Sequence, residues 1–136
     1  MNRQVLRHRV WTAYQQWDGA SGRLQVPCAW CGREITAAQG FDVHEYLVKR
    51  SAAPKAQQHL IMVVENCVPV HPSCHMQHGQ TKAFALTSLA YACGTLGPER
   101  IARWYVSLWE QQNLAVPRGR IPCGEEWEAY LVGVIG

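Results

Sequence analysis

Apolar positions divide the amino-terminal half of the chain into one helix and two extended segments. Residues 3–17 space their apolar side chains as an amphipathic helix does; these are Val5, Leu6, Val10, Tyr14 and Trp17. The DGASG stretch at 18–22 then predicts a turn. FDVHEYLVK at 41–49 alternates well enough to predict a strand, and HLIMVV at 59–64 predicts a second strand after a loop at 50–58.

A short helix is predicted over residues 72–78. Pro72 suits the first helical position, where its missing N–H has no partner to lose, and Gly79 suits the position just past the end. Upstream, CAWCG at 28–32 has the shape of a tight knuckle in which glycine relieves the backbone. Knuckle, strand, loop, strand and short helix follow one another, so we predict a ββα unit within residues 26–82.

The carboxy-terminal part, residues 83–136, is predicted to be a helical extension. Two helices divide around Gly94–Pro98, a loop follows at 117–124, and a last short helix covers about 125–133. One apolar stripe at helical spacing indicates packing rather than a platform for nucleic-acid bases; it consists of Ile101, Trp104, Tyr105, Leu108 and Trp109. With a helical segment at 1–25, the predicted fold class is α+β. Three roles stay open for the extension: packing on the ββα unit, binding DNA, or contacting a second copy or another protein.

Composition narrows the class of protein. Of the 136 residues, 48% are hydrophobic and 17% are charged, which argues against disorder. No apolar run approaches the roughly 20 residues that span a bilayer, and the first residues lack the apolar core of a signal peptide. We therefore expect a cytoplasmic protein. In that compartment, six cysteines beside six histidines favour metal binding over disulfides.

The positive charge is concentrated near the amino terminus. The net charge is +3, and the first sixty residues carry eight basic residues against four acidic ones. The eight are Arg3, Arg7, Arg9, Arg23, Arg33, Lys49, Arg50 and Lys55. This distribution indicates that the amino-terminal half is the anion-binding half.

Two residue pairs have the spacing of zinc ligands. Cys28 and Cys31 form a CxxC, and His71 and Cys74 form an HxxC. Together they predict a closed structural zinc site of the Cys3His kind, in which the amino terminus of the short helix also favours Cys74 as a thiolate. The simpler interpretation is a surface histidine and core cysteines. A CxxC redox protein is a further alternative.

The histidines that remain on the short helix indicate a second centre. His75 is turned about 100° from Cys74, so it need not face the same ion, and His78 lies three residues further along. The other dense cluster of candidate ligands is DVHE at 42–45.

In this order, CxxCG, a strand histidine, EN and a CH pair on a short helix resemble the HNH endonuclease family. The family's motif letters fall on His44, Asn66 and His75, and the resemblance covers about residues 26–82, including GQTK after the helix. It implies a ββα-metal fold braced by Zn²⁺, a separate catalytic Mg²⁺ or Mn²⁺, and DNA as the partner. Small members of this kind are often similar to bacteriophage or mobile-element proteins.

The resemblance also implies residue roles. His75 becomes a ligand of the catalytic ion, and Asn66 bonds the loop between the strands to hold the strand histidine in register. The chain departs from the common pattern around His44, which Val43 precedes, so two alignments stay open. In one, His44 is the ligand and Glu45 the second residue; in the other, His44 is the base and Asp42, on the same strand face, joins the site.

Further residues are candidates for the site, and each has a plainer alternative. His78 is a candidate second ligand. Lys49, Arg50 and Lys82 are candidate phosphate contacts, or surface charges. The leading hypothesis is a metal-dependent endonuclease that hydrolyses DNA phosphodiester bonds by nicking or double-strand cleavage. The alternative is a zinc-braced nucleic-acid-binding module without catalysis, and RNA in place of DNA stays open.

Overall fold

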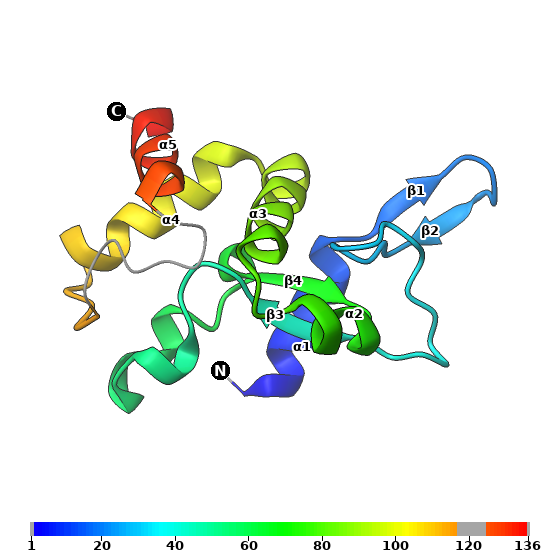
Figure 1. The fold of residues 1–136 in the computed structure, drawn as a ribbon, viewed down its shortest axis with the longest axis horizontal. Coiled ribbons are helices and arrows are strands. Elements are labelled where there is room, and N and C mark those ends of the chain that lie inside the picture. Colours follow the sequence, from blue (N-terminus) through cyan, green and yellow to red (C-terminus); the bar gives the residue numbers. More distant parts are fainter. Residues whose placement is uncertain (1, 117–124, 136) are drawn as a thin grey trace.

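A two-stranded antiparallel sheet lies between helices in the computed structural model, which describes residues 2–116 and 125–135 (Figure 1). Strand β3 (Asp42–Glu45) pairs with β4 (Cys67–Val70), with His44 opposite Val68. All four residues of β4 are buried, because helices α1 (Arg3–Ala13) and α3 (Lys82–Leu96) contact this strand. Helix α2 (Pro72–His78) follows directly, with the predicted bounds and with proline in its first turn. The predicted α+β class is confirmed.

The second strand was predicted in the wrong place. Instead of a strand at 59–64, the chain forms the short 3₁₀ helices η1 (Arg50–Ala52), η2 (Lys55–Leu60) and η3 (Val64–Asn66). Ile61, Met62 and Val64 of this run are buried, but the backbone bonds locally: the N–H groups of Ile61 and Met62 both donate to the Gln58 carbonyl. The strand is CVPV, where Pro69 is tolerated because β4 has only one strand neighbour.

Asn66 closes the loop that joins the two strands. Its Oδ1 accepts from the backbone N–H groups of Leu47 (3.1 Å) and Val48 (2.9 Å). Its Nδ2 donates to the carbonyls of Val48 (2.7 Å) and Ile61 (2.9 Å). The side chain is fully buried, so these bonds satisfy backbone groups that water cannot reach. The predicted strand at 41–49 therefore ends early, because residues after Glu45 bond to Asn66 instead of a strand.

The amino-terminal segment contains a hairpin that was not predicted. Helix α1 (Arg3–Ala13) ends before residue 17, and strands β1 (Gln16–Asp18) and β2 (Arg23–Gln25) pair across the predicted turn. Trp17 is 67% exposed, so it does not continue the apolar stripe of the helix. Figure 1 shows this hairpin projecting from the rest of the molecule.

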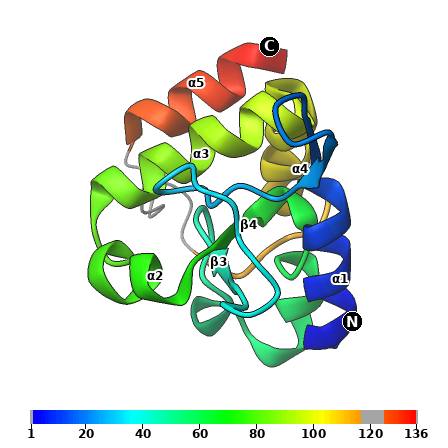
Figure 2. The same cartoon turned by 90° about the vertical axis from the view of Figure 1, so that its right-hand side faces the viewer.

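Helices α3 (Lys82–Leu96), α4 (Pro98–Glu110) and α5 (Glu125–Ile135) form the extension (Figure 2). The predicted break is confirmed at Gly97, whose φ of 91° suits glycine. Residues Ile101, Tyr105 and Leu108 of the predicted stripe are buried, and α4 packs on both α3 and α5. The loop predicted at 117–124 lies outside the described residues.

One hydrophobic core includes side chains from all three predicted segments. Examples are Val10 of α1, Val68 of β4 and Phe84 of α3, each with no exposed surface. Within the described residues, none of the helices has the length and apolarity needed to cross a membrane. Because α1 and α3 pack against β4, both helices are held next to the strand pair of the ββα unit.

Replacing Asn66 with alanine is expected to destabilise the fold severely. Four buried backbone groups lose their partners, and each unsatisfied group costs about 1–3 kcal/mol before relaxation, so we expect a loss of at least about 3 kcal/mol in the free energy of unfolding. Denaturant titration of the zinc-loaded protein measures this. Asn2→Ala, which removes one exposed helix cap, should cost only about 1 kcal/mol; equal losses would contradict the role given to Asn66.

Candidate functional site

The four predicted zinc ligands converge. The ligand atoms of Cys28, Cys31, His71 and Cys74 all lie within 4.8 Å of one another. Nδ1 of His71 is 3.3 Å from Sγ of Cys31 and 3.9 Å from Sγ of Cys74. A tetrahedral ion with Zn–S of about 2.3 Å and Zn–N of about 2.05 Å separates sulfur and nitrogen by about 3.6 Å, between these values. The cluster could therefore hold a zinc ion.

Two local structures bring the ligands together. The knuckle is closed by bonds from Cys28 N–H to the Arg33 carbonyl and from Gly32 N–H to the Cys28 carbonyl, with Gly32 at a φ of 77°. Its next residue, Ala29, donates to the Pro69 carbonyl of β4. The knuckle is thus fixed to the strand that leads into α2, where the other two ligands lie.

A carbonyl fixes the tautomer of His71. Nε2 lies 3.1 Å from the carbonyl oxygen of Glu34, which can only accept, so Nε2 carries the hydrogen. The lone pair of Nδ1 then points at the thiols. A ligand histidine held in this way by a backbone carbonyl is the usual arrangement in zinc sites.

The thiols crowd one another. Burial raises the pKa of Cys28. Hydrogen bonds from the backbone N–H groups of Cys31, His71 and Trp30 lower this pKa by more than burial raises it, so the net shift favours the thiolate. Burial and the neighbouring Cys28 and Cys31 raise the pKa of Cys74 to about 12. Without a metal ion, these effects outweigh any contribution of the helix terminus to the pKa of Cys74. A divalent cation offsets the repulsion among neighbouring thiolates.

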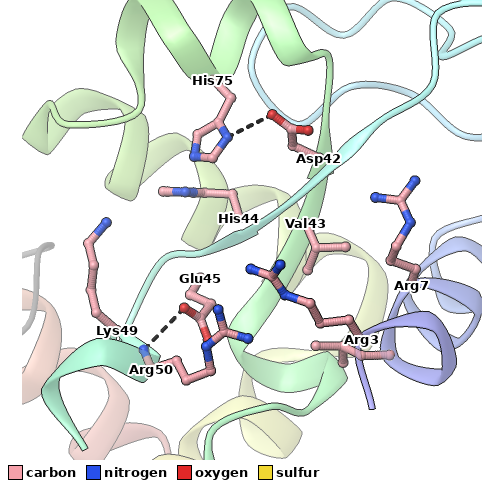
Figure 3. A pocket seen from close by; sticks show the side chains of 10 residues that line it. Arg3, Arg7, Asp42, Val43, His44, Glu45, Lys49, Arg50 and His75 are labelled. Carbon is pink, nitrogen blue, oxygen red and sulfur yellow. Dashed lines mark hydrogen bonds and ion pairs between the residues drawn. The ribbon is translucent and has the colours of Figure 1, made fainter.

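A cavity of about 510 Å³ lies along β3, between residues of α1 and α2 (Figure 3). It is lined by Arg3, Leu6, Arg7, Asp42, Val43, His44, Glu45, Lys49, Arg50 and His75. His75 comes from the helix that carries Cys74, and its Nδ1 lies 3.0 Å from Oδ2 of Asp42. His44 approaches the His75 ring edge-on, with centroids 5.0 Å apart. The cavity therefore gathers Asp42, His44 and His75.

His44 and Glu45 have different surroundings. His44 is 3% exposed and lies edge-on to Phe84 at 4.7 Å between ring centroids. Burial, together with His75 and Lys49, lowers its pKa to about 3, so the imidazole is neutral at physiological pH. Glu45 accepts the backbone N–H of Arg50 at 3.1 Å, and burial raises its pKa. Of the two open alternatives, the geometry groups Asp42 with His44 and His75.

Three other predicted site residues do not line this cavity. Asn66 is buried within the strand-joining loop. His78 stacks on Trp30 of the knuckle, with ring centroids 4.7 Å apart. Lys82 is exposed at the start of α3. Lys49 and Arg50, in contrast, lie at the cavity as predicted.

Sequence reasoning missed residues that shape the cavity from outside the motif. Arg3 and Arg7 reach it from α1, and their four-residue spacing was the available signal. Gly79 was read only as a helix end. A side-chain carbon there would lie 2.5 Å from the His75 carbonyl oxygen and 2.6 Å from its ring, so glycine is needed for the close approach to His75.

Removal of one thiol is expected to release the metal. The wild type should bind one zinc per chain, and Cys31→Ser should lose most of it, because the three remaining ligands no longer close a tetrahedral site. Elemental analysis after exhaustive dialysis measures the content. Cys93→Ser, which changes a half-buried cysteine outside the cluster, should keep full zinc; equal loss in both variants would refute this ligand set.

The chain matches no protein-family model, no curated protein and no solved structure. What it does must therefore be inferred from the side chains themselves. Within residues 2–116 and 125–135, one group of three or more metal-ligating side chains converges, and it is the Cys3His cluster.

Proposed function

We propose that the protein is a metal-dependent endonuclease of the HNH kind that hydrolyses phosphodiester bonds of DNA. The observation that carries the proposal is the pairing of Asp42 with His75, beside His44, in a cavity with basic walls. A purely structural zinc module has no use for a second group of titratable side chains one residue away from its ligand Cys74. The resemblance of residues 26–82 to the HNH motif supports the same function.

Asp42 and His75 are the residues that would hold the catalytic ion. In the structure a hydrogen bond of 3.0 Å joins Nδ1 and Oδ2, and an ion bound to both atoms would replace the proton between them. A nitrogen ligand suits Mn²⁺ better than Mg²⁺, which prefers oxygen. When bound, such an ion supplies Lewis-acid polarisation of the phosphate and charge neutralisation at the leaving oxygen.

His44 would act as the general base. Its imidazole, which lies beside His75 and lines the cavity, would accept a proton from the attacking water while the water oxygen bonds to phosphorus and the bond to the 3′-oxygen breaks. The leaving oxygen takes a proton from solvent. Phe84 and His75 restrict the His44 ring, and Asn66 holds the loop that begins two residues after it, so Asn66 is a positioning residue.

A second candidate is a zinc-braced nucleic-acid-binding module without catalysis. It is favoured by the fact that three or more ligand side chains converge, among the described residues, only at the Cys3His cluster. Binding and cleavage are therefore measured separately in the experiments below.

Loss of either cavity histidine is expected to abolish cleavage. Supercoiled plasmid is incubated with zinc-loaded protein and added Mn²⁺ or Mg²⁺, and relaxed product is quantified. His44→Ala and His75→Ala should each lower the nicking rate by about 10² or more, the usual contribution of a general base or an essential ligand. His59→Ala, an exposed histidine that does not line the cavity, should nick normally. A wild type that binds DNA and zinc but never nicks would leave the binding module as the function.

Gly79→Ala is expected to slow cleavage while zinc is retained. The added carbon forces the His75 ring or the end of α2 to move, and a displacement of about 1 Å can cost up to about 10²-fold in rate. Nicking rate and zinc content are measured on the same preparation. Gly94→Ala is the matched control, because its added carbon meets nothing within 4 Å. Unchanged nicking by Gly79→Ala would show that the placement of His75 is not critical.

A further inference from the structure

We propose that α1 carries a phosphate-binding stripe, Arg3 and Arg7, which holds the nucleic-acid backbone against the Asp42–His44–His75 group. This inference rests on the proposed function and deepens it, because it adds a substrate-binding element from outside residues 26–82. Arg3 and Arg7 are four residues apart, so they lie on one face of the helix. Both line the cavity, and Figure 3 shows them projecting from α1 beside β3.

The cavity has basic residues on two walls. Arg3 and Arg7 come from α1, whereas Lys49 and Arg50 come from the segment after β3, and Figure 3 shows the Arg3 and Arg50 side chains extending toward one another near Glu45. A strand of nucleic acid that enters the cavity therefore meets cations from two separate elements of the fold. Phosphates on either side of a bond at His44 are the groups that such an arrangement suits.

Among the described residues, no carboxylate lies within ion-pair distance of these four cations, although Arg3, Lys49 and Arg50 act electrostatically on Glu45. Four cations face the carboxylates of Asp42 and Glu45, which leaves two excess positive charges in the cavity. Three other arginines of the described chain are paired: Arg23 with Glu34, Arg100 with Glu65 and Arg103 with Glu99. Asp42 bonds to His75 and Glu45 accepts a backbone N–H. This surplus favours a polyanion over a neutral ligand.

Arg7 is held in place before any ligand binds. Its Nη1 donates to the Phe41 carbonyl at 2.7 Å, and its guanidinium lies 4.2 Å from the centre of the Phe41 ring. Trp11, one helical turn further along α1, also packs on Phe41, with the two ring centroids 5.1 Å apart. A fixed guanidinium loses less side-chain entropy on binding, and its remaining N–H groups are available to phosphate oxygens.

The same contacts fix α1 relative to the catalytic group. Phe41 immediately precedes Asp42, so the bond from Arg7 fixes the backbone that carries the candidate ion ligand. The arginines therefore lie at a set position relative to Asp42, close to where the scissile phosphate would be. Contacts of this kind are made to the backbone and carry no base information, so this element should strengthen binding without adding sequence specificity.

The test measures binding of a fluorescent DNA duplex to zinc-loaded protein, without added Mg²⁺ or Mn²⁺, over a series of salt concentrations. The variants are Arg3→Gln, Arg7→Gln and the double variant. Each lost phosphate contact should reduce the slope of log K against log salt by about 0.9, so the double variant should lose about 1.8 and bind about 10-fold or more weakly at moderate salt. Arg9→Gln is the matched control, because it removes the same charge from α1 at a residue outside the cavity.

Two results would overturn the inference. One is an unchanged slope in the double variant, and the other is an equal reduction in Arg9→Gln, which would mean that only net charge matters. Arg3→Gln is the variant least expected to disturb folding. Among the described residues the Arg3 side chain, unlike that of Arg7, makes no hydrogen bond or ring contact. Plasmid nicking in parallel separates the two proposals. If the double variant shows a reduced slope but the wild type does not nick, the phosphate site is retained and catalysis is refuted. If the wild type nicks but the slope of the double variant is unchanged, catalysis is retained and the phosphate site is refuted.

Discussion

The arrangement of this protein depends on the attachment of α2 to the cysteine knuckle. Cys28 and Cys31 converge with His71 and Cys74, which lie just before and within the first turn of the helix. An ion bound to this cluster would connect the knuckle directly to the start of α2. Because His75 follows Cys74 directly, the same attachment determines where His75 meets Asp42. A short helix of seven residues has little stability of its own, so its position comes from these ligands and not from helix propensity.

A second set of contacts brings His44 to the same place. Phe84 of α3 lies against His44, and the Trp30 ring of the knuckle stacks on Phe84 at 5.3 Å between centroids. The helical extension is therefore part of the wall behind the histidines. On the other side of the strand, Asn66 ties the loop after β3 to the residues before β4. The aromatic contacts and the buried amide together restrict both the ring and the backbone of His44.

The departures from the expected fold have specific physical causes. HLIMVV has the composition of a strand, yet it belongs to the loop. Its backbone makes local 3₁₀ hydrogen bonds, and the Ile61 carbonyl accepts from the side chain of Asn66. Pro69 makes CVPV an unfavourable strand segment by sequence. It is acceptable here because β4 pairs with only one strand. Trp17 fits the helical spacing of α1 but belongs to a hairpin, since the turn at 18–22 pairs it with Leu24. In each case the hydrogen bonds formed in the fold outweighed the preference of the residues alone.

The sequence by itself determined the elements whose signals are local. The Cys and His spacings defined the metal cluster, and Pro72 and Gly97 marked helix boundaries, because ligand geometry and backbone restrictions act over a few residues. Tertiary structure alone decided that Asp42, rather than Glu45, meets His75, and that Arg3 and Arg7 join a cavity whose other walls lie about forty residues away. Those contacts depend on how α1 and α2 pack against the strand pair, and no spacing along the chain encodes a distance between elements that only the folded core brings together.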